Sequence, residues 1–515
     1  MCWQNTLSSY EQNSVAVTFA TQLEELERRS PDISNLLKVL SFFDPEGMPI
    51  KMIIEGADEL QRKSASDLRS SDITTQALES QQPLLRKFVA GLVRHRRSTS
   101  LADPAPEDMN NVPNIESKVD SLITLIQSPV KLHEAIQTLQ HLSLVGYEST
   151  LDSSILRIHD LIQITIQECA VRNQQHDWFR VAVALACGAF QHIDDPASHT
   201  CWPQCEAFSP HIQSLTKWDD ERNIGNSDLH EANVGIARYF TARARYGEAE
   251  KLFERVLAGR AKLLGPRHLD TLRTEKGLAI VYRLQGRYAE AEVLYGRVLT
   301  GRTKLLGVNH PDTLLTAHDL ASVYVRQGRY KEAEMLYKRV MIDREKLLGP
   351  EHPHTLWTVN NLAVVYTSQS RFGEAETLYK RVLKDREKVL GPEHPSTLRT
   401  IDNLADVYAS LGQYSDAEVL YKRALAGNEK VLGPDHPDTL HTVTGLANNY
   451  SSQGWYGEAE VLYRRAMVGQ DKLLGSKHPD TMLVVRNLVK FLDKQGRHEE
   501  ATELQHHFPL SCESQ

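Results

Sequence analysis

The most regular feature of the chain is a pattern of apolar and polar positions that repeats every 42 residues through its C-terminal half. Within one period, apolar residues recur at helical spacing from Thr355 to Ser368 and again from about Glu374 to Leu390. Gly391 and Pro392 then stop the second stretch. The pattern therefore predicts two helices, A and B, in each period.

Two residue types keep the same phase through the repeats. Alanine and histidine each recur every 42 residues, at Ala249, Ala291, Ala333, Ala375, Ala417, Ala459 and Ala501, and at His268, His310, His352, His394, His436 and His478. We interpret the alanines as close crossings of helices A and B, where a larger side chain would overpack the joint by about 1–3 kcal/mol. The histidines stand one per repeat, so they cannot converge on a metal ion and are predicted to be turn or capping residues at helix starts.

The repeats predict a stack, because one helix pair cannot bury its apolar face alone. We expect an all-α fold, a right-handed superhelix of 42-residue repeats, with six full units from about Asp228 and a shortened seventh ending near Phe508. In the last unit Val489, Leu492 and His498 replace the usual alanine and tyrosines, as an end cap would.

The repeat contains Leu-x-x-Asn-Leu-Ala-x-x-Tyr followed by Gly-Arg-Tyr-x-Glu-Ala-Glu-x-Leu-Tyr-x-Arg. This motif resembles the long tetratricopeptide repeat of kinesin light chains. The resemblance implies a superhelix whose concave face is lined by helix A and holds an extended or helical peptide. A true kinesin light chain is not expected, since the N-terminal part lacks the heptads that would join a motor coiled coil.

The candidate partner-binding residues lie on helix A at positions that differ between repeats. The positions two and five before the Leu of Leu-Ala are expected to point away from helix B, and the position just before that Leu is often Asn or Asp. The resemblance to tetratricopeptide proteins, whose asparagines at this place often bind a peptide backbone, suggests Asn361 and Asn403. The full predicted groove set is Asn361, Asn403, Asn360, Trp357, Asp319, Arg399 and Asn487. The alternative is that these are solvated residues with no special ligand.

The N-terminal half predicts short helices and one hairpin. An apolar helix through Leu36 and Phe43 ends at a turn, a second helix starts near Lys51, and an amphipathic helix covers 132–146. A hairpin from Leu144 to Tyr147 and from Ile155 to Ile158 suggests a winged helix. The expected organisation is therefore 1–97 and 114–172 as an α-rich, winged-helix-like domain around a flexible insertion at 98–113, then a helical connector at 173–227 and the array at 228–508.

Leu40 to Pro49 and Ile158-His159-Asp160 resemble the winged-helix part of signal-transduction NTPases of the NB-ARC and NACHT type. In that family a Met-His-Asp histidine approaches the phosphate of the nucleotide. The family's Gly-Lys-Ser or Gly-Lys-Thr phosphate loop does not occur in this sequence. A helix-start role is therefore favoured for His159, and a nucleotide contact would need a separate NTPase chain.

Composition and cysteine spacing limit the partners, the location and the metal sites that can be expected. The formal net charge of -8 argues against a nucleic-acid partner. The six cysteines do not make a disulfide framework, and neither a signal peptide nor an apolar run of about 20 residues is seen, which predicts a cytoplasmic location and no membrane partner. His199, Cys201, Cys205 and His211 are spaced too loosely for zinc, so packed or free thiols are expected.

We find no catalytic motif in the sequence, and no cofactor or metal is predicted. The first hypothesis is a non-enzymatic scaffold that binds a protein or peptide in the concave groove. The second is a regulatory fragment of an NB-ARC or NACHT switch that acts with a separate or missing nucleotide-binding module. The identity of the partner and the oligomeric state are left open.

Overall fold

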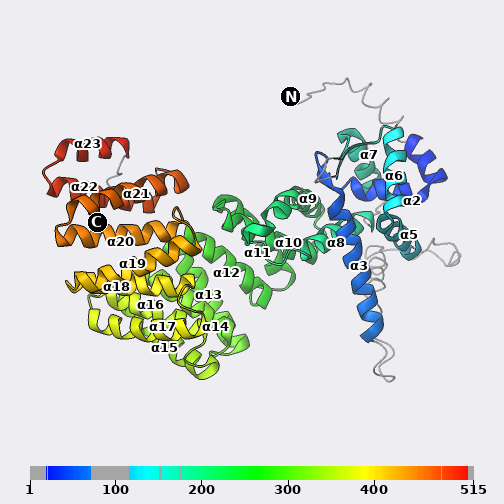
Figure 1. Cartoon of the computed structure of the whole chain (residues 1–515). Helices are drawn as coiled ribbons and strands as arrows, with labels where there is room; N and C mark the ends of the chain where they lie inside the picture. Colours follow the sequence, from blue (N-terminus) through cyan, green and yellow to red (C-terminus); the bar gives the residue numbers. More distant parts are fainter. Residues whose placement is uncertain are drawn as a thin grey trace. The chain divides into compact units, whose positions relative to one another are not determined.

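The computed structural model describes residues 19, 21–70, 115–149, 154–172, 177–476 and 478–508. The chain divides into two compact units, an N-terminal unit up to Gln285 and a C-terminal unit from Gly286, whose elements are labelled in Figure 1. The predicted insertion at 98–113 lies outside the described residues. Within the described ranges, no helix combines the length and apolarity needed to cross a membrane.

The N-terminal unit is mostly helical. Its helices are α2 (Pro31–Leu40), α3 (Ile50–Ser70), α5 (Ile115–Gln127), α6 (Pro129–His141), α7 (Asp160–Arg172), α8 (Asp177–Gln191), α9 (Trp202–Glu221), α10 (Ser227–Ala242), α11 (Tyr246–Leu263) and α12 (Leu269–Leu284). The predicted hairpin is confirmed as β2 (Val145–Ser149) and β3 (Ser154–Ile158), paired antiparallel. A third short strand, β1 (Met48–Pro49), was not predicted and adds to the other edge of β3, giving the order β1-β3-β2.

The core of this unit is aromatic and tightly packed. The Phe179 and Trp218 rings lie 4.2 Å apart, and Phe42 meets Trp218 edge-on at 5.1 Å. Helices α3 and α8 cross at Gly56, where a Cβ atom would lie 2.1 Å from the carbonyl oxygen of Leu185. Only glycine permits this approach, so the apolar residues of α8 can pack directly on α3.

The histidines and cysteines of this unit have separate structural surroundings. His159 accepts a hydrogen bond from the N–H of Leu161 at the start of α7, as the helix-start interpretation predicts. His211 is buried, which lowers its pKa to about 4, and its Nδ1 accepts from the N–H of Asp44. Cys201 and Cys205 are free thiols, and burial raises the pKa of Cys205 to about 12. The expected packed thiols are therefore present.

The C-terminal unit continues the alternation of A and B helices. The A helices are α14 (Pro311–Arg326), α16 (Pro353–Ser368), α18 (Pro395–Ser410), α20 (Pro437–Gln453) and α22 (Pro479–Lys494). The B helices are α13 (Tyr288–Leu306), α15 (Tyr330–Leu348), α17 (Phe372–Val389), α19 (Tyr414–Val431), α21 (Tyr456–Leu474) and α23 (His498–His507). Successive A helices and successive B helices each start 42 residues apart, so the predicted period and the all-α fold are confirmed.

Local chemistry fixes the helix ends. At the starts of α12, α14, α16, α18 and α20 a period-locked histidine caps the helix, because its Nδ1 accepts the N–H two residues later at 3.1–3.2 Å in His268, His310, His352, His394 and His436. The turn after helix A needs a left-handed residue, usually glycine such as Gly328 at φ 74°. Ser370 occupies this place in its repeat and takes the same conformation at φ 59°.

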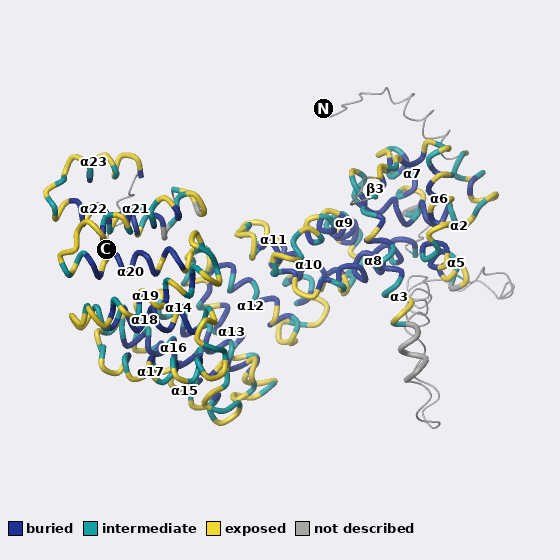
Figure 2. The backbone as a smooth tube through the Cα atoms, viewed as in Figure 1, coloured by how far each residue is buried: buried dark blue, intermediate teal, exposed yellow. Residues whose placement is uncertain are grey.

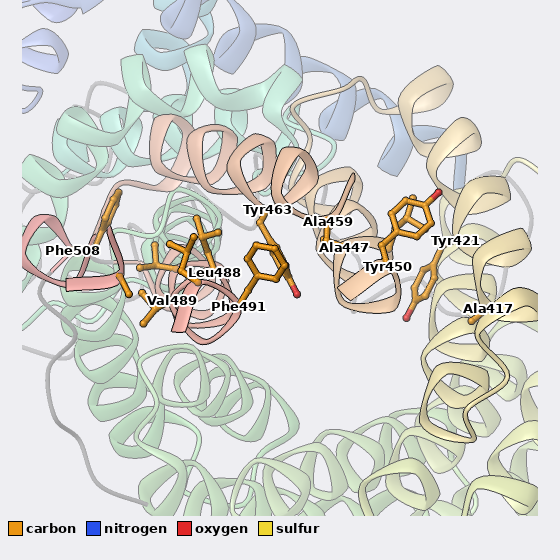
Figure 3. Close-up of a cluster of buried hydrophobic side chains, with 14 of the residues drawn as sticks. Ala417, Tyr421, Ala447, Tyr450, Ala459, Tyr463, Leu488, Val489, Phe491 and Phe508 are labelled. Carbon is orange, nitrogen blue, oxygen red and sulfur yellow. The ribbon is translucent and has the colours of Figure 1, made fainter. Parts of the chain in front are cut away.

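The seven period-locked alanines are all buried, which agrees with the predicted close helix crossings. Buried residues run along the A helices, as α16 and α20 show in Figure 2. Near the C-terminus, Tyr463 of α21 points toward Phe491 of α22, with the ring centroids 5.5 Å apart (Figure 3). Val489, Leu492 and Phe508 are buried in the same cluster, so the atypical residues of the last repeat close this core.

Candidate partner-binding face of the A helices

The A helices of the C-terminal unit form one continuous face. Each contacts the A helix of the next repeat, α14 with α16, α16 with α18, α18 with α20 and α20 with α22. Elements on the inside of a curved stack lie closer together than those outside, so these contacts identify the A helices as the inner wall. The curvature of such solenoids creates an extended concave surface for binding.

One position on this face stays accessible from repeat to repeat. It is occupied by Asp319, Asn361, Asn403 and Asn487, on α14, α16, α18 and α22, and all four are partly exposed. In the described part of the chain, the side-chain amides of Asn403 and Asn487 have no hydrogen-bond partner. These amides are therefore available to a ligand backbone.

Asn361 differs because it belongs to an aromatic cluster. Its Nδ2 donates to Nε2 of His318 at 3.0 Å, which assigns the proton of that ring to Nδ1. Trp357 stacks on His318 with 3.7 Å between ring centroids, and the Arg344 guanidinium lies 5.9 Å from the indole centroid. Trp357 is only partly buried, so one pre-organised apolar surface remains open beside Asn361.

The expectation that the position two before the Leu is exposed on this face is wrong for His318, Asn360 and Asp402. All three are buried and bond to a threonine of the next A helix. The contacts are His318 Nδ1 to Thr358 at 3.5 Å, Thr400 to Asn360 Oδ1 at 3.4 Å, and Thr442 to Asp402 Oδ2 at 3.1 Å. The prediction failed because it considered helix B as the only neighbour, whereas the next A helix covers this position.

The arginines that hold these threonines were missed. Arg260, Arg302, Arg344 and Arg386 are buried near the ends of B helices, 42 residues apart. Nη1 of each donates to a threonine Oγ1 14 residues later, at 2.6–3.0 Å, and to a backbone oxygen 10 residues later. The same 42-residue period that revealed the alanines could have found them in the sequence.

We name the repeating set of side chains after its B-helix member. The Arg386 layer consists of Arg386 on α17, Asn360 on α16 and Thr400 on α18, with Arg386 Nη1 3.5 Å from Asn360 Oδ1 and 2.6 Å from Thr400 Oγ1. Burial lowers the pKa of Arg386 to about 10, with exposed Arg399 contributing. The guanidinium therefore stays protonated at neutral pH, and its Nη1 donates to Asn360, Ser396 and Thr400.

The Asn428 layer has the same architecture with different charges. Asn428 of α19 replaces the arginine and donates to Thr442 of α20 at 3.1 Å, while Asp402 of α18 replaces Asn360. Burial raises the pKa of Asp402 well above its usual range, and nearby Asp406 raises it further. Burial also raises the pKa of Asp406, whose carboxylate accepts a hydrogen bond from Tyr421.

The N-terminal unit carries its own cavity of about 530 Å³ on the corresponding helices. Arg273, Lys276 and Gly277 of α12 line it, and they occupy the same repeat positions as Trp357, Asn360 and Asn361. Arg273 pairs with Glu231 of α10, so this lining is charged. Three of the repeat positions singled out in the sequence thus line a cavity in the N-terminal unit.

Comparison with known proteins supports the repeat assignment. The family model Tetratricopeptide repeat matches residues 228–304, 277–341, 312–388, 359–430 and 417–468. A solved structure named as a kinesin light chain with nearly identical TPR-like repeats, from Podosopora anserina, is 32% identical, with 40% of this chain and 98% of that chain covered and a TM-score of 0.35.

Two further solved structures are similar. BtubC (BKLC) from P. vanneervenii is 24% identical over 46% of this chain and 92% of its own, with a TM-score of 0.36. The apo quorum sensor NprR from B. thuringiensis is 13% identical over 76% and 98%, with a TM-score of 0.48. No curated protein matches the chain. The chain belongs to the tetratricopeptide repeat proteins, with kinesin-light-chain-like repeats among its solved neighbours.

Proposed function

We propose that this protein is a non-enzymatic scaffold that binds a protein or peptide partner on the face of its A helices. Tetratricopeptide repeat proteins generally act as protein-interaction scaffolds. The observation that carries the proposal is the row of partly exposed Asn and Asp side chains, one on each of α14, α16, α18 and α22. A cytoplasmic location and a protein rather than nucleic-acid partner are part of the proposal.

The side chains on this face suit an extended backbone. The side-chain amides of Asn403 and Asn487 each offer an NH2 donor group and a carbonyl acceptor, which match the C=O and N–H of a peptide unit. Trp357, held against His318 at 3.7 Å, gives a rigid apolar anchor at little entropic cost. Asp319 and exposed Arg399 add charges of opposite sign along the same face. The arrangement supports recognition of a polar backbone with one apolar side chain.

The test is selection of peptides from a random display library on the full-length chain, followed by affinity measurements by fluorescence anisotropy. Changing Asn361 and Asn403 together to Ala removes two hydrogen-bonding groups, and we expect roughly tenfold weaker binding. Trp357→Ala should weaken binding at least as much. The matched control is Lys384→Ala, on the exposed side of α17, which should leave the affinity unchanged.

The affinities of the variants show whether the peptide binds on the A-helix face. Loss of affinity in the A-helix variants with an unchanged control supports binding on this face. If no peptide is selected, or if the double variant binds within twofold of the wild type, this face is not the binding surface.

A second candidate is a regulatory part of an NB-ARC or NACHT switch, with a winged-helix-like domain before the repeats. The observation that favours it is the β2–β3 hairpin between α6 and α7, with His159 at the start of α7. It predicts an in-frame phosphate-binding loop encoded upstream of Met1 or on a separate chain that co-purifies. Full-length transcripts with neither would contradict it.

A further inference from the structure

The Asn428 layer has a neutral residue where the preceding layer has the buried Arg386. Three earlier layers of the C-terminal unit carry buried Arg302, Arg344 or Arg386 at the position that Asn428 occupies here. In the same layer the neutral Asn360 of the preceding repeat becomes the carboxyl of Asp402. From one layer to the next, the cation on the B helix is therefore lost and a carboxyl is gained on the A helix.

Only one of the two carboxylate oxygens of Asp402 has a hydrogen-bond partner in the described part of the protein. The residue is 5% exposed, and its Oδ2 accepts from Thr442 at 3.1 Å. Its Oδ1 is buried without any hydrogen-bond partner. An ionised carboxylate buried in this way needs a cation or a proton, because the cost of removing it from water is large. Oδ1 of Asp402 therefore lacks a donor, which a cation or a proton could supply.

Asp406 extends the acidic surface toward solvent. It lies one turn after Asp402 on α18, accepts from Tyr421 of α19, and is partly exposed. Across from them on α20, His441 is exposed, with its Nε2 4.0 Å from Asp402 Oδ2, and Asp438 adds further negative charge. Within the described ranges, no lysine or arginine pairs with Asp402 or Asp406.

We propose that Asp402 and Asp406 form a subsite that binds a lysine or arginine side chain of the partner peptide. The inference rests on the proposed function, since the guest enters from the A-helix face. The guest would supply to this layer the charge that Arg386 supplies to the layer before it. A resident metal ion is less suited, because in the described part of the chain no three His, Cys, Asp or Glu side chains converge as ligands.

The chain itself provides variants that should fold. Asp402→Asn gives this layer the residue that Asn360 provides one repeat earlier. Asp406→Asn gives the residue found at Asn448 one repeat later, where Tyr463 donates to Oδ1 at 2.6 Å. Asn428→Arg introduces the arginine that the earlier layers carry at Arg302, Arg344 and Arg386, and it should fill the subsite from within. Circular dichroism melts confirm that each variant is folded.

The experiment selects peptides from a random display library on the wild-type full-length chain. We expect one position of the selected peptides to be enriched in lysine or arginine. Replacing that residue by norleucine should weaken binding to the wild type by at least roughly tenfold. In the Asp402→Asn/Asp406→Asn double variant, and in Asn428→Arg, the two peptides should bind within about twofold of each other.

The possible outcomes distinguish failure of the subsite from failure of the proposed function. Selected peptides without a basic preference, or a double variant that keeps the preference, would overturn the subsite while binding on the A helices stands. Calorimetric binding of Ca²⁺ or Mg²⁺ that depends on both carboxyls, without a basic preference in the peptides, would also overturn the subsite. So would a proton that Asp402 and Asp406 share while the peptide is bound. If no peptide binds at all, the proposed function fails and the subsite fails with it.

Discussion

The Arg386 and Asn428 layers use the same positions of the repeat and reach opposite electrostatic states. In the first, one buried guanidinium bonds to Thr400, to a backbone oxygen and to the Asn360 amide. In the second, an Asn donates to one threonine, and a buried carboxyl keeps an oxygen without a partner. The apolar frame is the same in both, because Ala375 and Ala417 are fully buried at equivalent crossings.

Under our proposal, this difference means that the repeat uses separate positions for folding and for recognition. The alanines, tyrosines and capping histidines build the stack and barely vary. The polar side chains between successive A helices vary in charge, so each layer can be closed by the chain itself or left for a guest. The Arg386 layer is closed, and the Asn428 layer is the open one in our proposal.

The largest effect is expected from removing the cation of the closed layer. Arg386→Ala removes the guanidinium that donates to Thr400, Asn360 and the carbonyl of Ser396, which should cost about 3 kcal/mol and lower the melting temperature by roughly 6–12 °C. Asn428→Ala should cost much less, since one bond is lost. Thermal melts of the full-length chain test this, with exposed Arg399→Ala as the control. Equal losses for the Arg386 and Asn428 variants would contradict the distinction between layers.

The shared apolar frame should respond equally in both layers. Ala375→Leu and Ala417→Leu each overpack a helix crossing, which should cost about 1–3 kcal/mol. Differential scanning calorimetry should show similar decreases in melting temperature for the two. Thr377→Leu serves as the control, because Thr377 is exposed on the same helix as Ala375. An unchanged melt for either alanine variant would refute the close crossing.

The charge difference should appear as a pH dependence. Because burial raises the pKa of Asp402, its ionised form lowers stability above the unfolded-state pKa of about 3.9, and this penalty is absent at lower pH, where both states are protonated. Asp402→Asn should therefore stabilise the chain at pH 7, by roughly 2–4 °C for about 1 kcal/mol, and much less at pH 4. Melts at both pH values, compared with Asn360→Asp in the Arg386 layer, measure the effect. A gain independent of pH would contradict the buried charge.

The smallest effect is expected at the helix caps, which both layers share. His394→Ala and His436→Ala each remove the acceptor for one N–H at a helix start, so about 0.5–1 kcal/mol should be lost in each. The two changes in melting temperature should agree within error. A loss confined to one repeat would show that the cap depends on its layer.

Much of the fold could be predicted because local rules repeat. Helical spacing, the glycine turns and the capping histidines are short-range features, and their 42-residue phase predicted the boundaries of α16 and α17 to within two residues. Asn361 and Asn403, which the resemblance to tetratricopeptide proteins suggested, are partly exposed. Asn360 was misjudged because its burial comes from Thr400, 40 residues away on another helix.

The sequence by itself determined the helix pairs, their period and the positions that pack, since these depend on neighbours within one or two repeats. Only the tertiary structure decided which varying positions face solvent and which are sealed, because that depends on how closely successive A helices approach. It also showed that Asp402 lacks a partner for one oxygen, since hydrogen bonding in a buried layer is set by side chains from three helices at once.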